Sequence, residues 1–509
     1  MTGPLIPAAS PEALLVAAML VPLAAAALIP LFHRLPNVRE AVTLLAAGAL
    51  AAIVWSLLPH VLDGARPALT VAEPLPGIAI AFAVEPLGML FALVAGSLWI
   101  VNSIYSIGYM RGNSEPRQTS FYVSFAVAIA ATMGLAFSAN MVTLFLFYEI
   151  LTLSTYPLVT HKATPDAMRA GRVYLMILIG TSMVLLLPAI VFTGVVAGTV
   201  DFQAGGILDG KVSAVVMSLL LALYVFGIGK AAVMPFHFWL PAAMVAPTPV
   251  SALLHAVAVV KAGVFTVLKV IVYIFGIDAL AKAGTADWLA VAAGGTVILA
   301  SVVALRQDNL KKRLAYSTVS QLSYVVLAAA ILTPISAVGA AMHIAAHAVS
   351  KITLFFAAGS IYTAAHKTEI SELDGIGWKM PVTMTAFAIG ALAMIGVPPT
   401  AGFLGKWFML QGALATEHWL ALGVIILSTV LNASYFLPIV YRAFFAEPRH
   451  AHALGAAAVK DAHVDHHDDD HGEAPWPILL ALSLTAAATV VLFFVPDVPL
   501  ALARLMIAG

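Results

Sequence analysis

The sequence has 509 residues, of which 62% are hydrophobic and only 10% are charged. This composition is typical of a polytopic membrane protein and excludes an ordinary soluble domain. The formal net charge of zero gives no basis for nucleic-acid binding, and the absence of cysteine excludes cysteine-ligated iron–sulfur clusters, disulfides and thiol catalysis on this chain.

Apolar runs long enough to cross a bilayer predict an all-α polytopic membrane protein with about 14 transmembrane helices. No basic residue precedes the first run, so we expect a retained helix there rather than a cleaved signal peptide. Glycine and proline interrupt the seventh and twelfth segments, which are therefore expected to be broken helices. The expected segments are 11–32, 38–58, 79–108, 118–137, 140–160, 168–196, 213–234 with a broken continuation to about 245, 250–275, 285–305, 313–333, 336–364, 380–416, 419–446 and 475–495.

The basic residues of the loops fall almost entirely on one face if the segments alternate in direction. The other face, including the C-terminal tail, carries only Arg66, Lys211, Lys282 and Arg504. Because cytoplasmic loops are enriched in lysine and arginine, we expect both termini outside and the odd-numbered loops in the cytoplasm. The expected location is the cell inner (plasma) membrane.

The two broken segments lie five spans apart, and each carries one buried lysine beside its interruption, Lys230 in the seventh and Lys406 in the twelfth. An odd number of spans per unit makes two such units inverted repeats in the membrane. We therefore divide the chain into an N-terminal three-helix segment (1–117), two five-helix repeats (118–275 and 285–446), a His/Asp-rich cytoplasmic loop (447–474) and a C-terminal helix (475–509).

The stretch 223–269 combines prolines with lysines in surroundings apolar enough to span a bilayer. A lysine at the centre of a membrane helix costs roughly 2.5–3.5 kcal/mol. Lys269 lies near the end of its helix, and we expect it to reach the interface by snorkelling. Lys230 and Lys261 have apolar sequence on both sides, so they indicate a broken helix that lines a polar ion or proton pathway.

Glu149 lies in the apolar fifth segment and needs a partner there, for which Lys230 is the natural candidate. One interpretation is a fixed structural ion pair. The other is a pair that switches: apolar surroundings favour the neutral amine, so a lysine that loses its acidic partner releases a proton. Arginine, which stays protonated, does not serve in this way.

Histidines accompany the buried lysines. His255 precedes Lys261 and is expected either to pass a proton or to bond a backbone carbonyl. His343, His347 and Lys351 are spaced four and four, so they share one helical face as a candidate proton relay. The His-x3-His spacing also matches metal ligands, but no carboxylate or cysteine accompanies it in the segment, which favours the relay.

Further polar residues have more ordinary interpretations. Tyr316, Ser320 and Gln321 in the tenth segment either hold water or pack, and Lys406, with no acidic neighbour in its own segment, is expected where a proton leaves the pathway. Glu85 precedes a proline and is expected near an interface. The His/Asp-rich loop is compatible with loose metal binding, although a solvated loop is favoured. No Walker loop or dinucleotide fingerprint is present, and we expect no cofactor and no metal.

Three stretches resemble the antiporter-like subunits shared by respiratory complex I, membrane-bound hydrogenases and Mrp-type sodium/proton antiporters. They are FYEILTLSTYPLV, GKAAVMPFHFWLPAAMVAPTPVSALLHAVAVVKAG and GVPPTAGFLGKWF. The resemblance implies the family fold with two inverted five-helix repeats. It also implies that Glu149 and Lys230 form the switching pair and that Lys261, His347 and Lys406 continue the proton pathway.

Within this family the chain is most similar to the D subunit of Mrp antiporters. The M subunit of complex I usually has glutamate where Lys406 stands, and the L subunit has a lateral C-terminal helix that this chain is expected to lack. A tenth-helix histidine common in complex I relatives has no counterpart between residues 313 and 333.

The first functional hypothesis is therefore a proton-translocating subunit of a multi-subunit Mrp-type monovalent cation (Na⁺)/proton antiporter. Its expected partners are other membrane subunits, the lipid bilayer, protons and possibly Na⁺. The alternatives are a proton-pumping subunit of NADH:quinone oxidoreductase or of a membrane-bound hydrogenase, a membrane scaffold whose lysines only fix assembly, and a relative that captures inorganic carbon.

Overall fold

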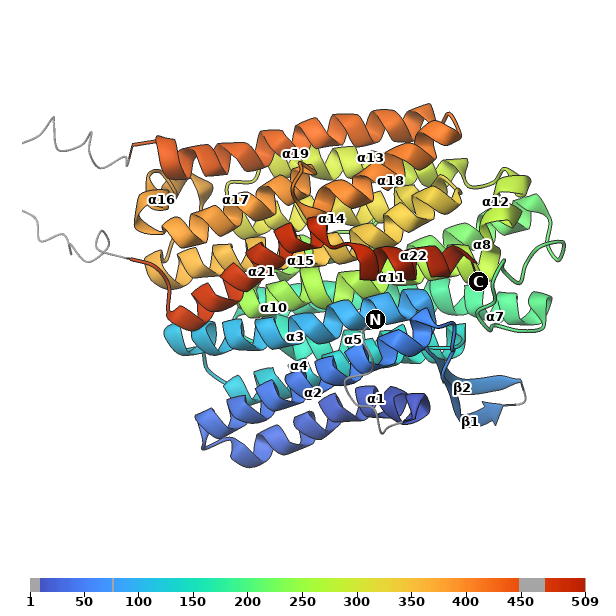
Figure 1. The fold of residues 1–509 in the computed structure, drawn as a ribbon, viewed down its shortest axis with the longest axis horizontal. Coiled ribbons are helices and arrows are strands. Elements are labelled where there is room, and N and C mark those ends of the chain that lie inside the picture. The colour runs from blue at the N-terminus through green and yellow to red at the C-terminus, as the bar shows by residue number, and fades with distance from the viewer. Residues whose placement is uncertain (1–9, 76, 448–471, 509) are drawn as a thin grey trace, which may run out of the picture.

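The computed structural model describes residues 10–75, 77–447 and 472–508, so most of the predicted His/Asp-rich loop lies outside the described residues. The long helices run roughly along one direction, the horizontal axis of Figure 1. The hairpin of β1 (Ala68–Leu75) and β2 (Ile78–Ala83) marks one end of the bundle, the hairpin end. Helix α16 (Ile376–Lys379) marks the opposite end, the α16 end.

Every predicted apolar segment contains helix. The helices are α1 (Pro11–Leu28), α2 (Pro36–Leu62), α3 (Pro86–Gly112), α4 (Gln118–Ala136), α5 (Met141–Val159), α6 (Pro165–Thr181), α7 (Leu187–Ala197), α8 (Ala214–Gly227), α9 (Trp239–Ala242), α10 (Thr248–Ala252), α11 (Val259–Val270), α12 (Ile277–Ala283), α13 (Asp287–Leu305), α14 (Leu310–Ala330), α15 (Pro334–Ala365), α17 (Pro381–Ile395), α18 (Ala401–Ala415), α19 (Trp419–Phe445), α21 (Trp476–Phe494) and α22 (Asp497–Ala508). Short 3₁₀ or π-helical turns connect or extend them at η1 (Ile29–Phe32), η2 (Ser182–Leu186), η3 (Gly229–Ala231), η4 (Ala243–Val245), η5 (Leu253–Val257), η6 (Ile271–Phe275) and η7 (Ile370–Glu372).

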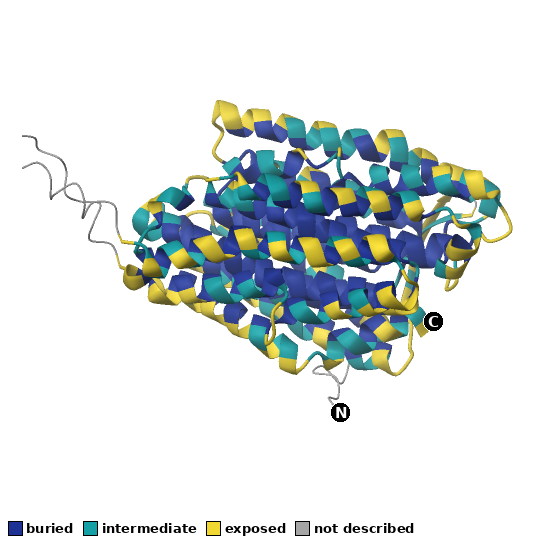
Figure 2. Ribbon diagram, turned by 90° about the horizontal axis from the view of Figure 1, so that it is seen from above, coloured by how far each residue is buried: buried dark blue, intermediate teal, exposed yellow. Residues whose placement is uncertain are grey.

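The prediction of an all-α polytopic membrane protein is confirmed. In the part of the chain that the structure describes, 11 helices or continuous helical segments are long and apolar enough to cross a membrane, and α8 and α17 are shorter apolar helices. Large apolar side chains are exposed on the outer helices, where lipid rather than water surrounds them, while the centre of the bundle is buried (Figure 2). The orientation across the membrane remains a prediction.

Both broken helices are present where glycine and proline predict them. In the seventh segment α8 ends at Gly227, and Ile228 leaves the helical region with φ −81° and ψ 62° before the short turn η3. In the twelfth segment α17 ends before Gly396, whose φ of +89° is easily adopted only by glycine, and α18 starts at Ala401. The division of the chain into two repeats and flanking segments remains a prediction.

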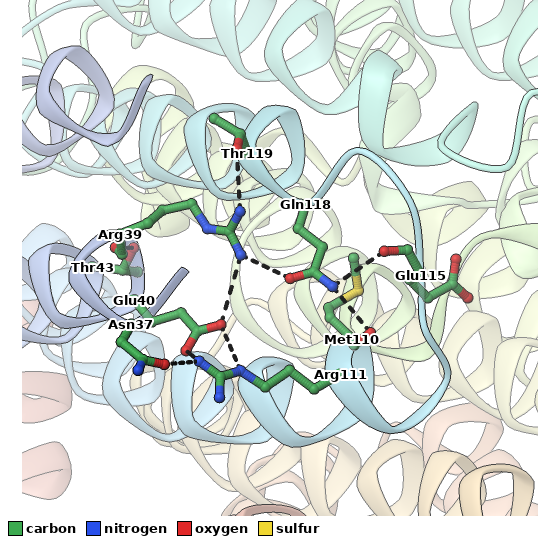
Figure 3. A network of polar contacts seen from close by, with 9 residues as sticks. All are labelled: Asn37, Arg39, Glu40, Thr43, Met110, Arg111, Glu115, Gln118 and Thr119. Atoms are coloured by element: carbon green, nitrogen blue, oxygen red, sulfur yellow. Dashed lines mark hydrogen bonds and ion pairs between the residues drawn. The ribbon is translucent and has the colours of Figure 1, made fainter. Parts of the chain in front are cut away.

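A polar network fastens the N-terminal helices to the rest of the bundle (Figure 3). Arg39 of α2 donates to Gln118 Oε1 at 2.7 Å and to Thr119 Oγ1 at 3.2 Å, at the start of α4. Glu40 of α2 pairs with Arg111 of α3. Because Arg39 and Glu40 are both only 4% exposed, these charges are held by each other and by amide and hydroxyl partners.

The third helix begins later than predicted. Residues 78–83 form strand β2, which pairs antiparallel with β1, and α3 starts only at Pro86. An apolar run of this length does not distinguish a strand from the first turns of a helix. The deciding contact is distant in sequence, since the Ala83 N–H donates to the Phe137 carbonyl after α4.

The structure also contains α22, which lies within the predicted C-terminal segment (475–509) but after the last predicted spanning run (475–495). This helix contacts α3 and α15, and its buried side chains are Pro499, Leu502, Ala503 and Met506. With 12 residues it is too short to span a bilayer, which is why a search for spanning runs misses it.

The break in the twelfth segment depends on a close approach at Gly402. A Cβ there would lie 1.8 Å from the Ala393 carbonyl oxygen, a backbone atom that cannot rotate away. We predict that Gly402→Ala lowers the free energy of unfolding by about 1–3 kcal/mol, the usual cost of overpacking. The measurement is the apparent unfolding midpoint of the purified chain in detergent.

Gly423→Ala in α19 is the matched control, because a Cβ at Gly423 meets nothing within 4 Å. In a helix interior that change is expected to be neutral or stabilising by up to about 1 kcal/mol. Equal midpoints for the two variants would contradict the packing of α17 against α18.

Candidate functional site

The intramembrane lysines and histidines lie in the most buried part of the bundle. In an 18-residue apolar stretch of Thr248–Phe275, 100% of the residues are buried, and in the corresponding stretch of Pro334–Ala365, 94% are buried. No other candidate span of the described chain is buried to this extent. Lys230, Lys261 and Lys351 are 0% exposed, and Lys406 is 4% exposed. None of these four lies at a lipid boundary, so their charges are an internal feature of the protein.

The break after α8 directs Lys230 toward α5. Its Nζ donates to the Tyr148 carbonyl at 2.8 Å and to Thr152 Oγ1 at 2.5 Å, and lies 3.1 Å from the centre of the Tyr148 ring. The backbone N–H of Lys230 donates to the Tyr148 hydroxyl at 3.1 Å. A helix break therefore frees a backbone donor and positions the amine at the same point.

Glu149, the predicted partner of Lys230, is not joined to it by an ion pair within the described residues. Its Oε1 is buried without a hydrogen-bond partner in the described part of the chain, and Glu149 directly follows Tyr148, whose carbonyl accepts from the Lys230 amine. The structure therefore has the two groups close but unpaired, with Tyr148 and Thr152 holding the amine. The switching role of the pair remains a prediction.

The backbone at Lys230 touches helix α11. A Cβ at Gly263 would lie 2.3 Å from both the Ala231 nitrogen and the Lys230 carbonyl carbon. Only glycine permits this approach, which brings the turn η3 against the helix that carries Lys261, two residues before Gly263.

Lys261 begins a chain of contacts through the centre of the bundle. Its Nζ is in hydrogen-bond contact with His347 Nδ1. The rings of His347 and His343 are stacked with centroids 6.0 Å apart, and His343 Nε2 bonds Gln321 Oε1 at 3.0 Å. The predicted His343–His347 face is therefore directed at α11 and α14, which both supply polar partners.

The contacts continue to Lys406. Gln321 Nε2 donates to the Met394 carbonyl at 3.2 Å, and Lys406 Nζ donates to the same carbonyl at 3.0 Å and to the Ile395 carbonyl at 2.9 Å. These carbonyls are free because α17 ends at Ile395. These contacts join Lys261, His347, His343, Gln321 and Lys406. We call this set, together with Lys230, the polar axis; Lys230 adjoins the set only through the backbone contact of η3 with α11.

Lys351 and His255 lie beside the polar axis. Lys351 follows His347 by one turn of α15, and its Nζ bonds Ser317 Oγ and, at 3.3 Å, the Leu314 carbonyl. Neither ring nitrogen of His255 has a hydrogen-bond partner in the described part of the chain, so the alternative of a carbonyl-bound histidine is wrong.

The two broken helices present their lysines in the same way. Lys230 lies over the ring of Tyr148 in α5, and Lys406 lies 4.8 Å from the ring centre of Tyr324 in α14. Each tyrosine belongs to the span two positions before the broken one. This repeated arrangement supports the internal symmetry that the matched breaks suggest.

Lys269 corrects the sequence analysis. The expectation that it snorkels is wrong, because it is 0% exposed, and its Nζ donates to the Ser138 carbonyl at 2.8 Å and pairs with Glu85. The prediction fails because the acidic partner, Glu85, directly precedes α3, where no local sequence pattern connects it with Lys269.

Three more predicted residues are placed by the structure. Ser320 bonds Ser301 of α13, Gln321 belongs to the polar axis, and Tyr316 is only partly buried. No group of three or more metal-ligand side chains occurs within residues 10–75, 77–447 and 472–508. The His/Asp-rich loop falls largely outside these ranges.

Residues 138–432 match the protein family described as the transmembrane part of NADH:quinone oxidoreductases and Mrp antiporters. Subunit N of the NADH-quinone oxidoreductase of Desulforudis audaxviator is 32% identical over 72% of this chain and 74% of its own length. A protein of Rhizobium meliloti described as part of a probable K⁺/H⁺ antiporter is 29% identical over 79% of this chain, but this chain spans only 41% of that protein.

The fold is also found among solved structures. A chain of the Mrp complex from Dietzia sp. DQ12-45-1b superposes with a TM-score of 0.82, covering 98% of this chain and 97% of that chain at 21% identity. At this identity the likeness shows a shared fold.

The contact between Lys351 and Ser317 gives a stability prediction. Ser317→Ala leaves the Lys351 amine with only the Leu314 carbonyl, and we expect a loss of about 1–3 kcal/mol in the free energy of unfolding. The apparent unfolding midpoint in detergent reports the change.

Ser350→Ala in α15 is the control, because within the described residues the Ser350 hydroxyl bonds only the Ala346 carbonyl of its own helix, at 2.8 Å. We expect that variant to shift the midpoint less, since alanine favours the helix and no amine loses a partner. If both variants lower the midpoint equally, Ser317 has no special role toward Lys351.

Proposed function

The chain belongs to the membrane-subunit family of NADH:quinone oxidoreductases and Mrp antiporters, and from this premise we propose that it moves protons along the polar axis. One observation carries this proposal: Lys261, His347, His343 and Gln321 are joined by hydrogen bonds and one ring contact inside a membrane helix bundle, and Gln321 and Lys406 donate to the same Met394 carbonyl. Lys230 adjoins this series through the contact of η3 with α11.

The chemistry follows from the groups in contact. An amine that meets an imidazole exchanges a proton with it without leaving the apolar interior, because only one of the two carries the charge. Lys261 and His347 are such a pair. His343 and Gln321 extend the contact toward Lys406, whose ammonium form is stabilised by the free carbonyls at the end of α17.

Glu149 sets the charge of the first amine. When Glu149 is ionised and turned toward Lys230, it favours the ammonium form, and when it is turned away, the apolar surroundings favour release of the proton. Lys230 is held by Tyr148 and Thr152 in this structure, which corresponds to the unpaired arrangement. Movement of Glu149 is therefore the proposed switch.

More specifically, we propose that the chain is a proton-translocating subunit of an Mrp-type antiporter, which exchanges protons for monovalent cations that include Na⁺. Three observations support it: lysine stands at position 406, the fold is shared with a chain of the Mrp complex, and the sequence is similar to part of a probable K⁺/H⁺ antiporter. The proposed setting is a multi-subunit assembly in the plasma membrane, with both termini outside.

A second candidate is a proton-pumping subunit of an NADH:quinone oxidoreductase or a membrane-bound hydrogenase. The 32% identity to a subunit N favours it. The two candidates differ in their partners, so purification of the assembled complex separates them: redox cofactors on the partner chains favour the second, and their absence favours the first.

Replacing Lys230 tests the function common to both candidates. In membrane vesicles that contain the whole assembly, we expect Lys230→Ala to lower proton movement per assembled complex by about 100-fold or more, the range of proton-transfer groups. A pH-sensitive dye reports proton movement, and the amount of purified complex gives the normalisation.

Lys282→Ala is the control, because it makes the same substitution at an exposed lysine of α12 and is expected to transport normally. If Lys230→Ala impairs assembly while transport per assembled complex stays at the wild-type level, the chain is a scaffold and the proposal is wrong.

A further inference from the structure

A second lysine–carboxylate pair lies at the hairpin end, outside the polar axis. Lys269 is in the last turn of α11, Glu85 directly precedes α3, and Ser138 follows α4. The Lys269 amine pairs with the Glu85 carboxylate and donates to the Ser138 carbonyl at 2.8 Å. Lys269 is completely buried, while the Glu85 side chain remains 14% exposed.

Glu85, the outer member of the pair, borders a cleft of about 270 Å³. Its lining includes Glu85, Ser138, Phe202 and two further titratable groups, Arg66 and Tyr273. The strand β2 that leads into Glu85 belongs to the hairpin at one end of the bundle (Figure 1). The partial exposure of Glu85 and the adjoining cleft therefore give one member of the pair access to solution, while the other member lies inside.

The inner member is on the same helix as the polar axis. Lys261, Phe265 and Lys269 follow at intervals of four residues on α11, so they share a face over about 12 Å of helix. Phe265 packs against Phe91 of α3 with ring centroids 5.0 Å apart, and Lys269 Nζ lies 5.4 Å from the Phe265 ring centre. Along this face of α11, Phe265 therefore comes between Lys261 and Lys269.

We propose that Glu85 and Lys269 form a proton-exchange site that connects the polar axis with solution at the hairpin end, with Phe265 as the gate between them. The ammonium group of Lys269 gives its proton to the Glu85 carboxylate, and the resulting carboxylic acid releases it to water in the cleft. The neutral Lys269 amine then accepts a proton from Lys261 through water when Phe265 moves aside. This inference rests on the proposed function.

The choice of residue favours exchange over a fixed structural pair. Two other carboxylate pairs in the described chain, Arg111 with Glu40 and Arg442 with Asp374, use arginine, which does not release its proton. A third pair, Arg39 with Glu40, also uses arginine although both side chains are only 5% exposed, so burial alone does not select lysine. Lysine, which exchanges its proton more readily, stands at the completely buried position next to the cleft.

The absence of cysteine from the sequence allows a precise test. In vesicles containing the whole assembly, we expect Lys269→Cys to lower proton movement per assembled complex by at least about tenfold. Reaction with aminoethyl methanethiosulfonate, which places an amine at the new cysteine, is expected to restore transport. Methyl methanethiosulfonate, which adds a neutral group, is expected not to restore it.

Wild-type assembly treated with each reagent shows any effect on partner chains, and Asp374→Asn is the control for loss of an ion pair at another site. Wild-type transport by Lys269→Cys, or equal rescue by both reagents, would overturn the inference. If Lys269→Cys does not assemble, Glu85→Gln is the deciding variant. A similar loss of proton movement per assembled complex supports the exchange site, and transport at the wild-type level overturns it.

Lys230→Ala in the same vesicles separates the two proposals. If Lys230→Ala loses transport while Lys269→Cys and Glu85→Gln keep it, only the exchange site is wrong. If Lys230→Ala also transports normally, the proposed function fails with it.

Discussion

A protonated amine inside a bilayer requires other polar groups to replace the water it has lost. This constraint explains why both broken helices carry a lysine at the break. At Lys406 the interruption frees the last carbonyls of α17, which accept from the amine. At Lys230 the interruption frees a backbone N–H for the Tyr148 hydroxyl and directs the amine at α5. Lys261 of α11 and Lys351 of α15 take no carbonyl from their own helix; the partner of each amine comes from a neighbouring helix instead.

The two halves of the bundle share a geometry but not a charge distribution. Tyr148 and Tyr324 each lie beneath a broken-helix lysine, yet the residue after Tyr148 is Glu149, whereas Val325 follows Tyr324. Only the first half therefore has an acidic group beside its tyrosine and lysine in this arrangement. In the proposed mechanism this difference gives the polar axis a direction, because the protonation of Lys230 depends on Glu149, whereas the protonation of Lys406 depends on neutral carbonyls.

The sequence predicts those features in which a residue type is unusual for its neighbours in the chain. A lysine or a proline in an apolar segment is visible without any structure, so the broken helices and the buried Lys230, Lys261 and Lys406 were found. Pairings across the fold were not. Glu85 and Lys269 are far apart in sequence, Gln321 had an equally good packing interpretation, and the β1–β2 hairpin depends on a contact after α4. The short helix α22 carries no spanning signal.

The central claim is that a proton passes through the histidines between the two broken helices. The most direct measurement is proton flux through the purified assembly in liposomes with His347→Phe, which keeps an aromatic ring against His343 but has no nitrogen to carry a proton. The account predicts that flux falls to the level of protein-free liposomes while assembly is retained. Flux at the wild-type level would show that protons do not use the polar axis.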